Sequence, residues 1–229
     1  MALEDDLESE VGTIFKTAWT ERDGQVVPDP ASLKLGNDAI KLTGTVLYAD
    51  LSDSTVMVDS RTPQFAAEVY KAFLHCAAKV IKHFCGTITA YDGDRVMAVY
   101  LGDAKNTSAV KTALKLNWVR QNIIQPAINK QYTTDFVLRH VVGIDTAELY
   151  IARTGVRGDN DLVWVGRAAN WAAKLAALDH SYPTWITAAI YNNMNDQVKF
   201  AEGVNMWQNR TWTQMNSASI YCSTYHWAL

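Results

Sequence analysis

The chain has 229 residues, 48% of them hydrophobic, which suits one domain with a full-sized core. Its 21 basic and 24 acidic residues give a net charge of −3, so nothing indicates a broad basic face, and nucleic acid is not an expected partner. The acidic N-terminal sequence is unlike a signal peptide, and no apolar run reaches the roughly 18 residues of a membrane span. Three cysteines without a CxxC pair fit a reduced cytoplasm, so we expect a cytoplasmic protein that does not bind membranes.

The first part of the chain predicts a helix followed by a loop. Apolar residues recur at helical spacing over residues 4–21, while glycines and prolines mark residues 22–42 as irregular. We therefore expect an N-terminal helical extension over residues 1–42 and one folded domain over residues 43–229.

The domain itself predicts strands and helices in turn. Strands are expected at 44–51, 87–91, 95–100, 136–144, 148–151 and 162–165, and helices at 63–84, 106–126 and 167–178. Residues 52–61 are polar and turn-like, and Asp92-Gly93 is typical of a tight hairpin turn. After residue 178 the pattern alternates short strands with one short helix. This order predicts a ferredoxin-like α+β sandwich, with helices covering one face of a largely antiparallel sheet.

Two aspartates stand where a sheet edge could bring them together. Asp50 ends the first core strand, and Asp94 lies in the hairpin turn. Two carboxylates and a backbone carbonyl, here that of Leu51, are the hard oxygen ligands that divalent cations prefer. The following turn, with Ser52, Ser54 and Thr55, offers backbone N–H groups and hydroxyls for phosphate oxygens. Taken singly, Asp94 fits ordinary turn chemistry and Asp50 fits a helix cap.

Three segments around these acids resemble the class III nucleotidyl cyclase catalytic domain. VLYADLSDST (46–55) is similar to the family's first metal loop, and YDGDRVMAVY (91–100) to its second metal hairpin. VWVGRAANWAAKLAAL (163–178) is similar to the family's helix with an Asn and an Arg one turn apart. The likeness runs from about residue 44 to residue 225 in order and spacing, and three segments in sequence are more specific than any one.

The resemblance implies an enzyme that closes a nucleoside triphosphate into a 3′,5′-cyclic monophosphate and releases pyrophosphate. Asp50, Leu51 and Asp94 would hold two ions of Mn²⁺ or Mg²⁺ per site, a choice that the sequence leaves open. A homodimer would form the site between subunits, with Asn170 from the other chain orienting the ribose. The charge-stabilising residue four positions later is Lys174 instead of Arg, which keeps the charge and loses the planar fork.

Departures from the family pattern bear on the base. Ala90 and Val163 stand where purine cyclases place polar base-reading residues, and two small apolar side chains cannot pair with a purine edge. Asp53 replaces the glycine of the first metal loop. Tyr48 and Arg95 lie beside the metal aspartates and either could reach nucleotide, although a core aromatic and a solvent-facing charge are equally open interpretations.

A small domain without purine readers resembles the pyrimidine cyclases of bacterial Pycsar anti-phage systems. That likeness implies UTP or CTP as substrate, with UTP favoured, and a cyclic product that acts on a separate effector during defence. The activating signal and the effector are not encoded in any motif. The alternatives are a purine cyclase and a catalytically silent module for nucleotide binding or dimerisation. A diguanylate cyclase would carry a GG-acidic-acidic-Phe hairpin, and YDGDRV is not that motif.

Overall fold

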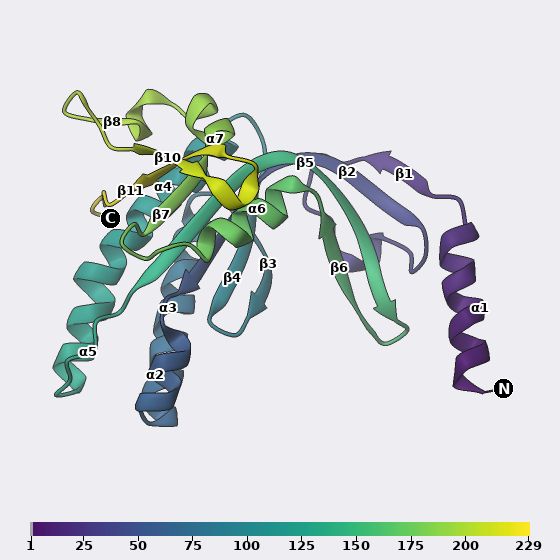
Figure 1. Ribbon diagram of the computed structural model, residues 1–229, viewed down its shortest axis with the longest axis horizontal. Coiled ribbons are helices and arrows are strands. Elements are labelled where there is room, and N and C mark those ends of the chain that lie inside the picture. The colour runs from purple at the N-terminus through teal and green to yellow at the C-terminus, as the bar shows by residue number, and fades with distance from the viewer. Residues whose placement is uncertain (1) are drawn as a thin grey trace.

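The computed structural model describes residues 2–229 and is built on one large mixed sheet (Figure 1). Seven strands lie in the order β10-β11-β7-β5-β2-β4-β3, while β1 pairs with β2 and β6 pairs with β5. β8 and β9 form a separate hairpin. The strands are β1 Thr20–Asp23, β2 Asp38–Leu51, β3 Thr87–Asp92, β4 Arg95–Tyr100, β5 His140–Val156, β6 Asp159–Val165, β7 Thr184–Thr187, β8 Phe200–Ala201, β9 Val204–Asn205, β10 Gln208–Trp212 and β11 Ala218–Ser223.

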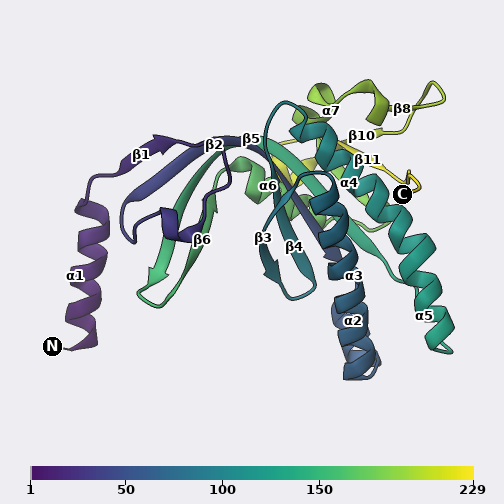
Figure 2. The same ribbon diagram turned by 180° about the vertical axis from the view of Figure 1, so that it is seen from behind.

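Four central strands form the expected ferredoxin-like core. They lie antiparallel in the order β5-β2-β4-β3, with α3 (Pro63–His83) between β2 and β3 and α4 (Lys105–Val119) between β4 and β5. Thr62 caps α3 by accepting a hydrogen bond from the N–H of Phe65, and Pro63 takes the first helical turn, where its missing N–H costs nothing. Seen from behind, α3 and α4 cover one face of this core, and both contribute to its largest buried cluster (Figure 2). The predicted α+β sandwich is thus confirmed.

Helix α6 (Arg167–Ala176) packs on the opposite face of the sheet, in front of it in Figure 1. Its Ala168 and Ala172 share a buried cluster with Val46, whereas the next residue of β2, Leu47, belongs to the cluster beneath α3 and α4. Gly143 of β5 permits this close contact, because a Cβ there would lie 2.2 Å from the carbonyl oxygen of Ala172. The expectation that the helices cover one face is therefore wrong for α6.

Beyond the core, β2 and β5 continue into an arm to which β1 and β6 are added (Figures 1 and 2). Helix α1 (Leu3–Lys16) stands at the end of this arm, where the Asn37 side chain donates to the carbonyls of Ile14 and Thr17 at 2.8 and 2.6 Å. None of its described side chains is buried, and the exposed apolar ones are Leu3, Leu7, Val11, Ile14 and Phe15. The apolar stripe of α1 is thus left uncovered within residues 2–229.

Several predicted bounds near the N-terminus are wrong. The helix ends at Lys16 instead of residue 21, and residues 20–23 form β1. Residues 38–42 belong to β2 instead of a loop, since residues 39–42 pair with residues 149–152 of β5 and residue 38 pairs with β1. Local sequence gives this stretch no strand signal because the partner strand lies over 100 residues away.

The predicted helix over 63–84, the hairpin over 87–100 and the helix over 167–178 are confirmed to within two residues. The predicted strands at 136–144 and 148–151 are one strand, β5, and 52–61 contains a helix instead of only a turn. The expected stop at Pro126 is wrong, because a π-helical turn at 120–124 leads into another helix with Pro126 in its first turn.

Every helix within residues 2–229 is too short or too polar to traverse a bilayer. The remaining helices are α2 Ser54–Ser60, α5 Gln125–Gln131 and α7 Ala188–Asn193, with 3₁₀ turns Pro30–Ser32, Asp196–Val198 and Thr213–Met215.

Candidate active site

Asp50 and Asp94 come together where β2 ends beside the β3–β4 hairpin. The pairing of Ala49 with Val96 places Asp50 opposite Arg95 when the register continues by one residue, and Asp94 lies in the adjoining turn. Gly93 makes this turn tight with φ of +60°, a conformation that glycine adopts without steric cost. The sheet thus delivers two acids to one point from segments more than 40 residues apart.

The Asp94 carboxylate acts electrostatically on Asp50. Burial and the nearby Asp94 carboxylate raise the pKa of Asp50 to about 6, while Arg95 acts in the opposite direction. Oδ2 of Asp94 is buried and accepts no hydrogen bond from any group in residues 2–229. A buried carboxylate oxygen without a donor is costly, so this pair is arranged for a positively charged ligand that supplies the missing interaction.

Tyr48 and Arg95 lie on the same face of the sheet as this pair. The Arg95 guanidinium sits 5.4 Å from the centre of the Tyr48 ring and donates to Asp92 at 2.6 Å. Burial raises the pKa of the Tyr48 hydroxyl, which therefore stays protonated and can donate a hydrogen bond. Both side chains are half-buried, so neither the core-aromatic nor the solvent-charge interpretation describes them fully.

The loop after Asp50 leads directly into α2. The N–H of Ser52 donates to the carbonyl of Arg139 at 3.0 Å, so this backbone group is already used within the chain. Ser54 and Thr55 open α2, where they lie half-buried and exposed. Asp53 caps the helix with φ of 58°, the left-handed conformation that favours glycine. Asp53 therefore holds a backbone conformation that a glycine would adopt without strain.

These residues fit divalent cations in their donor chemistry. Asp50 and Asp94 are hard oxygen donors, one Asp94 oxygen lacks a hydrogen-bond donor, and Leu51 adds a backbone carbonyl next to Asp50. No group of three or more His, Cys, Asp or Glu side chains in residues 2–229 could hold a metal ion. The expected set has two carboxylates and a carbonyl, so it falls outside such a group, and its occupancy stays a prediction.

Asn170 and Lys174 are exposed on α6 and stand one helical turn apart. No hydrogen bond or ion pair within residues 2–229 joins either of them to Asp50 or Asp94. The Lys174 ammonium instead lies 3.6 Å from the sulfur of Met215. The described chain therefore does not bring the two halves of the expected site into contact.

A buried acid, which the sequence pattern did not single out, fixes the start of α6. Asp145 of β5 is fully buried, accepts from the Thr187 hydroxyl at 2.6 Å and lies 3.2 Å from Nε of Arg167. The Arg167 guanidinium also lies 4.9 Å from the Trp171 ring centre. Burial raises the pKa of Asp145, against the Thr187 hydrogen bond and the Arg167 charge. The only sequence signal was an acid inside an apolar strand.

The two predicted purine-reading positions lie on different strands of the arm and hairpin. Ala90 is half-buried on β3 and Val163 is exposed on β6. Their neighbours Thr89 and Leu162 line one hollow of about 300 Å³ between these strands. Neither side chain is polar, and their place beside a bound base stays a prediction.

Comparison with known proteins defines the class and then the family. The fold matches that of the adenylyl cyclase CyaB from P. aeruginosa with a TM-score of 0.69, at 18% identity and over 81% of this chain and 95% of that one. The chain therefore has the class III nucleotidyl cyclase fold. No family model matches the chain.

Relatives found by sequence define the family more narrowly than the shared fold does. The chain is 53% identical to a uridylate cyclase of Burkholderia cepacia and 48% identical to one of Xanthomonas perforans, each over 100% of both chains. At this identity over full length, the chain belongs to the uridylate cyclase family.

Proposed function

We propose that this protein converts UTP into 3′,5′-cyclic UMP and pyrophosphate with the help of two divalent cations. The pair formed by Asp50 and Asp94, with its buried Oδ2 that lacks a donor, carries this proposal. The names of its relatives in Burkholderia and Xanthomonas support uridine over other bases.

The reaction is an internal phosphoryl transfer. The ribose 3′-oxygen attacks the α-phosphorus, the bond from that phosphorus to the pyrophosphate oxygen breaks, and the 3′-proton passes to solvent. Mn²⁺ or Mg²⁺ held by Asp50, Asp94 and the Leu51 carbonyl would favour ionisation of the hydroxyl and neutralise triphosphate charge. Ser54 and Thr55 stand at the loop that would contact the phosphates, whereas the N–H of Ser52 is already engaged.

Tyr48 and Arg95 are the proposed readers of the pyrimidine. Both are half-buried next to the acids and face each other, which restricts their motion and gives the pair a defined geometry. Arg95 can donate to a uracil carbonyl and Tyr48 can donate or accept, whereas Ala90 and Val163 give a purine no polar partner. Cytosine presents an amino donor where uracil has a carbonyl, so a donating Arg95 favours UTP over CTP.

The site is proposed to be completed by a second copy of the chain. Asn170 and Lys174 are exposed and unconnected to the carboxylates of their own chain, as a residue serving the partner's site would be. The uncovered apolar stripe of α1 gives a second copy additional surface to bury. By resemblance, the cyclic product would act on a separate effector in anti-phage defence in the cytoplasm.

The test is incubation of the purified protein with each of the four ribonucleoside triphosphates and Mn²⁺, with products identified by mass spectrometry. We expect cyclic UMP as the main product and at least about a 100-fold lower rate with ATP and GTP. Arg95→Gln should reduce the preference for UTP more than it reduces turnover, and Lys82→Gln, an exposed lysine at the end of α3, is the control. ATP or GTP as the best substrate would refute the proposal.

A further inference from the structure

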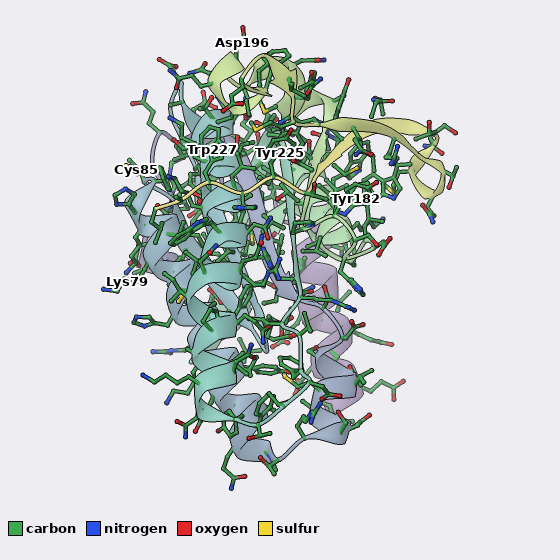
Figure 3. All side chains as sticks on the ribbon, turned by 90° about the vertical axis from the view of Figure 1, so that its left-hand side faces the viewer. Lys79, Cys85, Tyr182, Asp196, Tyr225 and Trp227 are labelled. Atoms are coloured by element: carbon green, nitrogen blue, oxygen red, sulfur yellow. The ribbon has the colours of Figure 1, made fainter. Side chains whose placement is uncertain are left out.

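A polar pocket lies at the same end of the sheet as the two acids, and its buried His140 points to the other face of the sheet. It has a volume of about 490 Å³, and its walls come from α4, the π-helical turn, the start of β5, the loop before β7 and the C-terminal segment. Asn117 of α4 secures the C-terminal segment by donating to the carbonyls of Thr224 and Tyr225. Figure 3 looks toward this side, where the C-terminal segment with Tyr225 and Trp227 crosses over α4.

Two arginines of this pocket have little compensating charge. Burial lowers the pKa of Arg120, and the nearby Arg139 guanidinium lowers it further. No carboxylate in residues 2–229 pairs with Arg120, and its Nε is buried without an acceptor. The carboxylate nearest Arg139 is that of Asp53, 3.9 Å away, and Arg139 donates instead to His180 at 3.1 Å.

His140 adds an unpartnered group to the pocket wall. Its side chain is 1% exposed, and neither ring nitrogen has a hydrogen-bond partner within residues 2–229. An uncharged imidazole ring carries one N–H donor and one acceptor nitrogen. A buried ring with both nitrogens unsatisfied calls for a ligand or solvent that bonds to it.

We propose that this pocket binds a compact, phosphate-bearing anion. Two guanidinium groups, the His140 ring and the nearby His226 offer several N–H donors around one space. The planar fork of arginine matches phosphate oxygens in pairs, and a phosphate would relieve the repulsion between Arg120 and Arg139. The volume exceeds that of a single phosphate and leaves room for a second phosphate or a small organic part.

The pocket is distinct from the two carboxylates but touches their loop. Leu51 pairs with His140 and Asp50 with Val141, so the alternation of a strand turns Asp50 and His140 to opposite faces. The contacts of Asp53 with Arg139 and His180, at 3.9 and 3.6 Å, link the pocket wall to the loop that follows Asp50. The inference itself concerns binding and does not require cyclase activity.

The binding of a phosphate-bearing anion in this pocket is tested by isothermal titration of the full chain with inorganic pyrophosphate. The buffer contains EDTA and no phosphate. We expect saturable binding that is the same in Asp94→Ala, because the carboxylates are not involved. Arg139→Gln and Arg120→Gln should each weaken binding at least about tenfold through loss of charged hydrogen bonds. Arg210→Gln, an exposed arginine of β10 outside the pocket, is the matched control and should bind as the wild type does.

Parallel titrations with inorganic phosphate and UDP separate the sources of the phosphate. If UDP binds more tightly than pyrophosphate, an organic part of the ligand fills the rest of the pocket. If pyrophosphate binds more tightly, a second phosphate fills it. Thermal unfolding of each variant checks its fold, and the half-exposed Arg139 carries the test if Arg120→Gln does not fold. No binding of any of the three at millimolar concentration, or binding unchanged in Arg139→Gln, would overturn the proposal.

Discussion

Two regions of like charge meet at the end of β2. One holds two carboxylates and the other holds two guanidinium groups. On one face, Asp50 and Asp94 place two carboxylates together, and an oxygen of Asp94 has no donor. In the neighbouring pocket, Arg120 and Arg139 place two guanidiniums together, and Nε of Arg120 has no acceptor. Like charges that repel each other in a partly dry site indicate a missing counter-charge, a cation in the first region and an anion in the second.

The two regions also differ in how clearly the sequence reveals them. The acids lie in two short segments that each match a family pattern, so they stand out in the sequence. The basic pocket draws its residues from four separate parts of the chain, none of which forms a motif.

Asp94→Asn should abolish cyclisation without unfolding the protein. Loss of a charged cation ligand should lower turnover at least about 1,000-fold, while metal-free stability should stay equal or rise because the repulsion with Asp50 is removed. Cyclic UMP formation and thermal unfolding in EDTA measure the two effects. Asp59→Asn, an exposed acid of α2, should leave both unchanged. Near wild-type turnover in Asp94→Asn would disprove the acid pair as the cation site.

Mixing two inactive variants tests whether the acidic region is completed by a second chain. Asp50→Ala and Asn170→Ala should each be inactive alone. After subunit exchange the mixture should recover up to about a quarter of wild-type activity, because half the dimers are hybrids with one intact site of two. Each variant exchanged with itself is the control. If activity does not recover although subunits are proven to exchange, the whole site lies within one chain. The basic pocket is likewise formed by one chain.

His140→Gln should flatten the acid side of the stability profile. The folded pKa of about 3 lies below the unfolded value, so the unfolded state binds more protons and stability falls as pH drops below about 6.5. Between pH 7 and pH 5 the wild type should lose about 2 kcal/mol more than the variant. Urea unfolding in phosphate-free buffer at both pH values measures this. Equal losses in the two proteins would show that His140 is not buried as a neutral ring.

Asp53 tests the loop that joins the two regions. Its φ of 58° suits glycine, so Asp53→Gly should be neutral or slightly stabilising, whereas Asp53→Val should cost about 1–2 kcal/mol. The contact with Arg139 adds little to this balance because both side chains are about half exposed. Chemical unfolding of both variants provides the measurement. A valine variant as stable as the glycine variant would contradict the left-handed conformation.

Much of the fold and of the acid pair was predictable from the sequence, because the signals are local. The periodicity of α3, the Asp-Gly turn before Asp94 and the apolar strand before Asp50 each depend on neighbouring residues. The order of these elements was enough for the ferredoxin-like core, since short connections allow few arrangements. Membership of the cyclase fold followed from three segments in the correct order.

Other features were decided only in three dimensions. Residues 38–42 join the sheet through pairing with β1 and β5, and α6 crosses to the second face because Gly143 leaves room for its backbone. The basic pocket exists because β5, α4 and the C-terminal segment converge there. Local sequence determined which elements form, whereas the burial of distant residues against each other determined which face they cover and which charges they bring together.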